Sequence, residues 1–170
     1  MAQSRPSPQK LVGVGFAAQG FDRSSYYAQM PDSRDHRVSF IFEGVGDEEP
    51  IGDFGLIGNG AAGQEIDRYD RALGTPSNTM LLASSENHTD NMQRVVEEIY
   101  FNYQGTGGTQ DPGVRGDICY FTTSGGGAVF STGSIAWCAS LSHRNYNNNV
   151  SRITANVLRR FASDEPLDGT

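Results

Sequence analysis

Apolar side chains near the end of the chain repeat with the period of an α-helix. From Val150 onward they recur at i, i+3, i+7, i+8 and i+11, which places them on one helix face. That face comprises Val150, Ile153, Val157, Leu158 and Phe161, with Arg152, Asn156, Arg159 and Arg160 mostly opposite. A helix with this much apolar surface must pack against another element. The expected platform is an upstream β-hairpin, with strands at 118–122 and 128–131 around a turn at 124–127.

Shorter apolar runs predict further strands earlier in the chain. We expect them at residues 11–18, 38–42 and 79–83. The second, VSFIF, is continuous enough to be typical of a buried strand. Internal repeats and linkers are absent from the sequence, which predicts a single α/β or α+β domain. We place that domain at 10–162, between a disordered lead-in at 1–9 and a disordered tail at 163–170.

Two short helices are expected between these strands. The first covers residues 64–73, because Gly74 and Pro76 form a strong stop signal after it. The second begins after Thr89 or Asp90, either of which can cap a helix N-terminus. Its buried face would comprise Met92, Val95, Val96 and Ile99.

Composition narrows the classes of partner. The chain has 170 residues, 36% of them hydrophobic, and 21 glycines, which indicates a loop-rich domain with surface left for a partner. Its net charge of -7 disfavours nucleic acid and anionic membranes, because phosphate binding needs clustered Lys and Arg. The first ten residues lack the apolar core of a secretion signal, and no apolar run is long enough for a membrane span. We therefore expect a soluble, cytoplasmic protein.

The cysteines and the single tryptophan are expected in the interior. Cys119 and Cys138 lie in apolar surroundings, and two buried free thiols in a reducing compartment are favoured over a disulfide. Trp137 follows the hairpin among small and apolar residues, where a large ring can seal the strands against the last helix.

A glycine-rich segment raises the possibility of nucleotide binding. Residues 58–63 fit the pattern G-x-G-x-x-G before the predicted helix at 64–73, and Glu86 lies at about the distance of a ribose-binding acid. Glu65 and Asp67 argue against it, because carboxylates in the first helical turn compete with a pyrophosphate for the same N–H groups. The favoured interpretation is close packing of the loop, with a nucleotide-binding module as the lesser alternative.

Two other acidic segments could carry chemistry. Residue types alone favour a solvated, self-paired face for the predicted helix that carries Glu65. Residues 84–90 (SSENHTD) follow a strand, where α/β folds place ligand contacts, so Glu86 and His88 could orient a water or a metal ligand. Alternatively, the segment only caps a helix and His88 lies on the surface. The histidines and cysteines lack the spacing of a zinc site, so no metal site is expected within this chain.

Several long segments, in the same order, resemble the C-terminal region of the large subunit of N,N-dimethylformamidases. They are LVGVGFAAQGFDRSSYY, FEGVGD, DFGLIGNGAAGQEIDRYDRALGTP, LASSENHTDN, SIAWCASLSH and NNNVSRITANVLRRF. The resemblance extends from Lys10 to Phe161. Because the family's large subunit is far longer than 170 residues, the chain would correspond to its final portion.

The resemblance implies hydrolysis of small N-substituted formamides to formate and an amine. It also implies a glutamine-amidotransferase-like three-layer α/β fold, for which this chain would supply the closing strands, the hairpin and the final helix. The family's large subunit is described as binding iron through two tyrosines and a glutamate, and as pairing with a small subunit. Segments that match the iron-ligand motif are missing from this chain, so the ligands are expected in the preceding part and the chain alone should be inactive.

The resemblance also makes Glu65 a catalytic candidate. It lies in GAAGQEIDR, and at the mouth of a glycine-rich loop its carboxyl could be partly desolvated and act as a general base or proton shuttle. Glu86 and His88 would help to hold substrate or a metal ligand in place. The alternative is a structural and oligomerisation domain without a catalytic role, in which open sheet edges pair with a partner.

Overall fold

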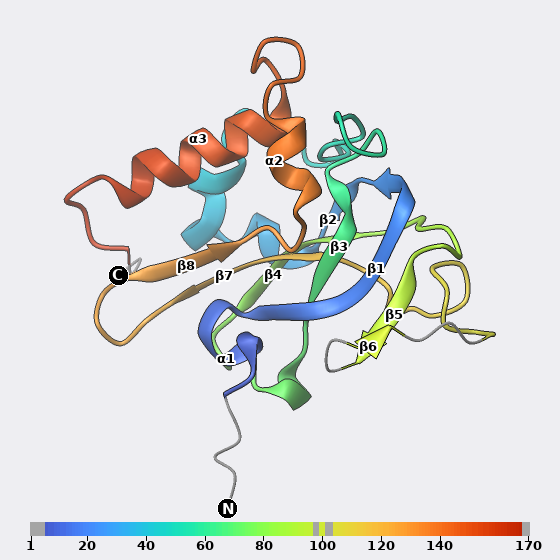
Figure 1. The fold of residues 1–170 in the computed structure, drawn as a ribbon. Coiled ribbons are helices and arrows are strands. Elements are labelled where there is room, and N and C mark those ends of the chain that lie inside the picture. The colour runs from blue at the N-terminus through green and yellow to red at the C-terminus, as the bar shows by residue number, and fades with distance from the viewer. Residues whose placement is uncertain (1–5, 97–98, 101–103, 168–170) are drawn as a thin grey trace, which may run out of the picture.

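The structure is a computed structural model that describes residues 6–96, 99–100 and 104–167 (Figure 1). Its strands are β1 (Val14–Ser25), β2 (Tyr27–Gln29), β3 (Ala62–Tyr69), β4 (Met80–Ser85), β5 (Gln93–Val96), β6 (Ile99–Tyr100), β7 (Asp117–Thr122) and β8 (Ala128–Ser131). The α-helices are α1 (Pro8–Val12), α2 (Ala136–Ser140) and α3 (Asn149–Phe161), and the 3-10 helices are η1 (Pro31–Arg34), η2 (His36–Phe42) and η3 (Arg71–Leu73).

The strands form two four-stranded antiparallel sheets. Their orders are β3-β1-β5-β6 and β2-β4-β7-β8. Figure 1 shows α3 lying over η2, and both lie on the same side of the second sheet as α2. The main apolar core fills the space between these helices and β2, β4 and β7. A smaller cluster of Ala18, Ile66, Met92 and Val114 lies in the first sheet region. The chain is therefore one mixed α/β domain.

The predicted hairpin and final helix are confirmed. β7 pairs with β8 from Cys119 opposite Ser131 to Thr122 opposite Ala128. Helix α3 begins after Asn148, whose side-chain oxygen accepts a hydrogen bond of 2.9 Å from the N–H of Ser151.

The apolar face of α3 is only partly buried. Val150, Ile153 and Val157 are buried, as predicted, whereas Leu158 is 63% exposed and Phe161 is 37% exposed. Leu158 follows Val157 by one residue, roughly 100° further around the helix, so it lies at the edge of the stripe that faces η2. This leaves a large apolar side chain in contact with solvent.

The predicted strand at 38–42 is wrong, because this segment forms the 3-10 helix η2. Val38, Ile41 and Phe42 are buried, and their spacing of i, i+3 and i+4 puts them on one side of a helix. Asp35 caps the helix by accepting a hydrogen bond of 2.9 Å from the N–H of Arg37. A short apolar run such as VSFIF does not distinguish a buried strand from a buried helical turn.

The predicted helix at 64–73 is also wrong, since most of it is strand β3. β3 pairs with β1 from Tyr69 opposite Val14 to Ala62 opposite Ser25. This ladder satisfies the backbone N–H and C=O groups of the segment, and it outweighs the local helix preference of QEIDR. Only η3 is helical, and it ends at Gly74 with a φ of 102°, which agrees with the predicted stop signal.

A third correction concerns the helix expected after Thr89 or Asp90. The segment instead forms β5 and β6, and β5 continues the first sheet by pairing with β1. Met92 and Val95 are buried as expected, but against β1 rather than on a helix face. The side chains of Val96 and Ile99 lie outside the described residues.

The first predicted strand begins later and runs further than expected. β1 covers Val14–Ser25, whereas Leu11 and Val12 belong to α1. Gln9, which we expected in a disordered lead-in, is buried in α1. Among the described residues, no helix is both long enough and apolar enough to cross a membrane.

Trp137 is buried, as predicted, and joins three elements. It lies on α2, its Nε1–H donates a hydrogen bond of 3.1 Å to Thr154 Oγ1 on α3, and its ring meets that of Tyr27 on β2 edge-on at 5.9 Å. Both cysteines are free, but only Cys119 is buried. The prediction for Cys138 is wrong, because α2 turns its Trp137 side inward and leaves Cys138 exposed.

We expect Trp137→Ala to lower the free energy of unfolding by roughly 3–5 kcal/mol, because the variant leaves a cavity between α2, α3 and β2. Urea unfolding followed by circular dichroism measures the change. Leu56→Ala is the matched control, since Leu56 is 82% exposed and should tolerate truncation. A Trp137→Ala variant with the stability of the control, or a parent fluorescence maximum typical of hydrated indole, would contradict the assignment.

Candidate functional site

Buried polar side chains gather where β4 ends and β7 begins. Ser84 and Ser85 close strand β4, and both are buried. A cleft of about 430 Å³ lies beside them, between the end of β4 and the loop at 108–115. Because β4 and β7 are neighbours in the second sheet, the polar groups of both strand ends are brought to this one edge.

Asp117 is the central charge of this cluster. Its carboxylate is fully buried and accepts three hydrogen bonds: 2.7 Å from Ser84 Oγ, 2.9 Å from the N–H of Tyr69, and 3.1 Å from Arg115 Nε. Burial raises the pKa of the Asp117 carboxyl, while Arg115 and the hydrogen bonds favour the ionised form. Since Tyr69 belongs to the first sheet and Ser84 to the second, the carboxylate connects the two sheets.

Ser85 and His88 form a second buried pair. Ser85 Oγ accepts a hydrogen bond of 2.7 Å from the N–H of Gly116 and lies 2.7 Å from His88 Nε2. Burial lowers the pKa of His88 to about 4, although the charge of Asp22 acts in the opposite direction. Within the described residues, His88 Nδ1 has no hydrogen-bond partner. The alternative that His88 lies on the surface is wrong, because its side chain is closed to solvent.

Glu86 lies between these buried residues but faces a different environment. It follows the end of β4, as predicted, and it is exposed at the rim of the cleft. Its backbone carbonyl accepts a hydrogen bond from Ser25 Oγ, which ties the segment to the end of β1. The structure therefore does not bring the Glu86 carboxylate and the His88 imidazole together, although they are two residues apart.

Glu65 lies on strand β3 and not at the start of a helix. Its side chain is exposed, and its Oε1 accepts a hydrogen bond of 3.5 Å from Gln19 Nε2 on β1. Its backbone carbonyl accepts a bond of 3.4 Å from the N–H of Ile135, which places the start of α2 beside it. The partial desolvation that we expected at the mouth of the glycine loop is absent in this chain, because β3 turns Glu65 outward.

Asp67 is a candidate that the sequence analysis missed. It is half-buried two residues after Glu65, so both side chains lie on the same face of β3. Burial raises the pKa of Asp67, and the charge of Glu65 raises it further. Glu65 and Asp67 are two residues apart in the sequence, but this spacing places both side chains on one face only in a strand.

The glycine-rich segment does not have the context of a dinucleotide site. Strand β3 follows it, where the fingerprint requires a helix. The chain approaches so closely that a Cβ atom on Gly60 would overlap the carbonyl oxygen of Ser25, and one on Gly63 would overlap the side chain of Ser24. The favoured interpretation, close packing of the loop against a neighbour, is confirmed.

A metal ion is held in a protein by several ligand side chains that lie close together. In the described part of the chain, no three His, Cys, Asp or Glu side chains lie close enough together to hold one.

Most of the chain is similar in sequence to known proteins. The family model described as "N,N-dimethylformamidase beta subunit-like, C-terminal" matches residues 1–150. The N,N-dimethylformamidase beta subunits of Alcaligenes sp. and Paracoccus aminophilus are each 52% identical to the chain over 158 residues. The chain belongs to this family. The aligned region covers 93% of this chain but 21% of each relative, so the N,N-dimethylformamidase-like domain spans about a fifth of their length.

Truncating Asp117 tests whether it connects the sheets of this N,N-dimethylformamidase-like domain. We expect Asp117→Ala to lower the free energy of unfolding by roughly 3–5 kcal/mol, because it leaves the buried donors of Ser84 and Tyr69 without their acceptor. Urea unfolding measures the change, with Asp47→Ala in an exposed loop as the control. Equal unfolding midpoints for the two variants would show that the buried carboxylate is dispensable.

His88 should make the domain sensitive to acid. The imidazole titrates near 6.5 when unfolded and at about 4 when folded, so the unfolded state takes up the proton first as the pH falls. The stabilisation is complete above about pH 6.5 and is lost as the pH falls toward 4. At ~1.4 kcal/mol per pKa unit, the free energy of unfolding decreases by about 3 kcal/mol over this range. Urea unfolding at several pH values should show a smaller pH dependence for His88→Gln. The same dependence in both proteins would contradict this prediction.

Proposed function

We propose that this chain is the C-terminal domain of an amidohydrolase that hydrolyses small N-substituted formamides to formate and an amine. The observation that supports this most directly is the 52% identity, over 158 residues, to two N,N-dimethylformamidase beta subunits. Identity at this level extends across both sheets and the helices that cover them. The names of these relatives give N,N-dimethylformamide as the substrate, and the wider substrate class and the products are what the family resemblance implies.

The proposed enzyme includes parts that this chain does not contain. We place the iron in the portion of the subunit that precedes this domain, and we include a separate small subunit. That portion would form a glutamine-amidotransferase-like α/β fold together with this chain, which would supply its closing strands, the hairpin and the final helix. In the described residues no three His, Cys, Asp or Glu side chains could hold a metal ion together, and no step of the proposal passes through a metal held by this chain. A cytoplasmic location remains a prediction.

Within this domain, Glu65 and Asp67 are the residues that we propose for proton transfer. Amide hydrolysis needs a group that accepts a proton from the attacking water. A second proton transfer must then deliver a proton to the departing amine. Glu65 is exposed at the edge of β3, where it can extend toward a neighbouring domain. Asp67 holds a proton more readily than an exposed aspartate, because burial and the adjacent Glu65 raise its pKa. The pair can therefore carry one proton between two carboxyls on the same strand face.

A structural domain without a catalytic role is the second candidate. It is favoured by the way in which Ser85, His88 and Asp117 are used, since all three are buried in contacts between strands. In that case Glu65 only bonds with Gln19, and the domain completes the fold and an interface of the subunit.

Replacing Glu65 in the complete enzyme separates the two candidates. If Glu65 transfers the proton, Glu65→Gln should preserve folding and iron content and lower kcat by roughly 10²–10⁴-fold. Formate release from N,N-dimethylformamide measures the rate, and the chain alone is expected to release none. Glu43→Gln, a change at another exposed glutamate, is the matched control. Near-normal turnover of Glu65→Gln would rule out Glu65 as the proton-transfer residue and favour the structural candidate.

Glu86 requires its own variant, because it lies at a different edge of the sheets. A catalytic Glu86 predicts that Glu86→Gln, rather than Glu65→Gln, lowers kcat in the same assay. Unchanged turnover in both variants would exclude Glu65 and Glu86 from the chemistry and favour the structural candidate.

A further inference from the structure

An apolar groove lies open on the outer side of α3. Its volume is about 510 Å³, and it runs between the helix and the loop at 142–148. Tyr146 and Leu158 line it from opposite sides and are 65% and 63% exposed. Leu141 and Ala155 extend the apolar lining between them. Two large apolar side chains exposed along the same groove mark a surface suited to contact with another protein segment.

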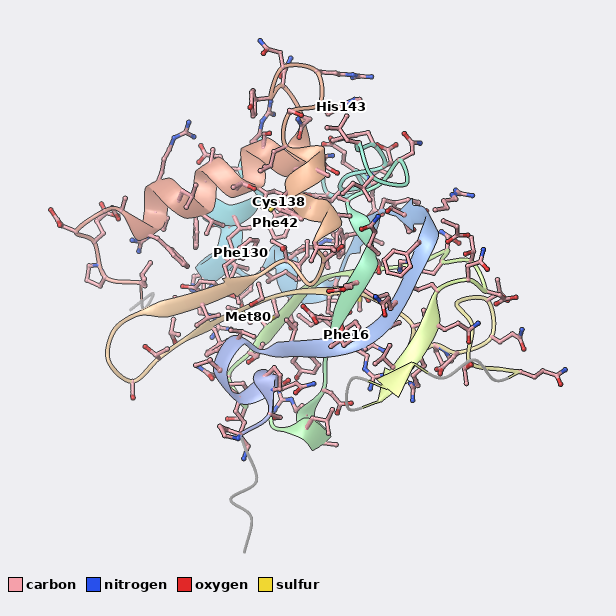
Figure 2. The ribbon with its side chains drawn as sticks, in the orientation of Figure 1. Phe16, Phe42, Met80, Phe130, Cys138 and His143 are labelled. Carbon is pink, nitrogen blue, oxygen red and sulfur yellow. The ribbon has the colours of Figure 1, made fainter. Side chains whose placement is uncertain are left out.

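The loop that carries Tyr146 is held in an unfavourable backbone conformation. Arg144, Asn145 and Tyr146 have consecutive φ angles of 48°, 54° and 65°, in the left-handed region that residues with a Cβ seldom adopt. Surrounding contacts must maintain such a conformation, and it is found most often at binding sites and clamps. Figures 1 and 2 show this loop projecting above α2 and α3, with His143 at its base.

The contacts that hold the loop are visible at its two ends. Asn148 Nδ2 donates hydrogen bonds of 3.0 Å to the carbonyl of Leu141 and 2.8 Å to that of His143. The His143 ring stacks on Phe54, with ring centroids 4.2 Å apart and planes inclined by 15°. These contacts fix the loop on the body of the domain, so Tyr146 is presented at the groove in a defined position.

The rim of the groove is positively charged, in contrast with the rest of the chain. Arg152 and Arg159 line it, and Arg144 is on the adjoining loop. Arg152 donates a hydrogen bond to the carbonyl of Gly44, which lies outside the groove, whereas Arg159 is exposed at the rim. Since the chain has a net charge of -7, this concentration of arginines next to apolar side chains selects for an acidic segment.

We propose that this groove docks an acidic segment with a bulky apolar side chain, contributed by the portion of the beta subunit that precedes this domain. This rests on the proposed function in one respect, namely that the chain works as the end domain of a longer subunit. The relatives provide the length for such a segment, because the aligned region is only 21% of each of them. A segment within the same polypeptide has a high effective concentration at the groove, so a shallow apolar site with a charged rim is enough to hold it.

The occupant can be identified by photocrosslinking in the complete enzyme. Benzoylphenylalanine replaces Tyr146 in the subunit assembled with its partner, and a matched protein carries it in place of Leu56, which is exposed elsewhere. Mixing isotopically heavy and light subunits before irradiation distinguishes crosslinks within one subunit from those between copies. The expected result is an adduct from position 146 to a segment of the same subunit with Asp or Glu beside an apolar residue. An adduct to a second copy or to the small subunit, or a yield no higher than that of the control, overturns the proposal.

Two further variants test the chemistry of the groove. Leu158→Asp and Arg159→Glu change residues on the solvent side of α3, so both should fold, and each should reduce the crosslink from position 146 several-fold. Unchanged yield in both variants overturns the assigned contacts. Formate release is measured on the enzyme that carries benzoylphenylalanine at position 146 and no other change. If this enzyme is active without the crosslink, the docking proposal alone is overturned, whereas an inactive enzyme with the crosslink counts against the proposed function and leaves the docking in place.

Discussion

Two four-stranded sheets meet in this domain, and one carboxylate accepts hydrogen bonds from both of them. Asp117 begins β7 in the second sheet, and its acceptor oxygens bind the backbone N–H of Tyr69 at the end of β3 in the first. Moving a carboxylate out of water costs several kcal/mol unless donors replace the lost hydration. Ser84, Tyr69 and Arg115 supply those donors, so the ionised group is stable only when the three segments that carry them are correctly placed. The arrangement of the sheets and the satisfaction of this charge therefore depend on each other.

The neighbouring polar contacts extend the same constraint along the sheet edge. The N–H of Ser85 donates to the carbonyl of Gly116 at 2.8 Å, while Ser85 Oγ accepts from the N–H of Gly116 and contacts the neutral His88. Close to this cluster, Trp137 links α2 and α3 to β2 through one hydrogen bond and one edge-on aromatic contact with Tyr27, which pairs with Ser85 in the sheet. The interior is thus held by polar groups with defined partners and by the apolar packing next to them.

This division has a functional consequence. Asp117, Ser85 and His88 take part in contacts between strands, and all three are closed to solvent. The acidic face of β3 and the groove between α3 and its strained loop are open at the surface. In the proposed function these two surfaces face other parts of a longer subunit, so that the domain would complete a site from outside rather than enclose one.

Local pattern alone was sufficient for some elements of this protein. The hairpin at 117–131, strand β4, helix α3 and the burial of Trp137 follow from short-range periodicity, turn residues and caps, because in these segments the local preference agrees with the structure that their distant partners impose. The family was likewise evident from contiguous segments. Tertiary structure decided the rest: the segment at 64–73 became a strand because β1, some fifty residues earlier, supplied its hydrogen-bond partners. The site shows the same limit, since Ser84, Tyr69 and Asp117 meet only after both sheets have formed, and Glu65 and Asp67 share a face only on a strand.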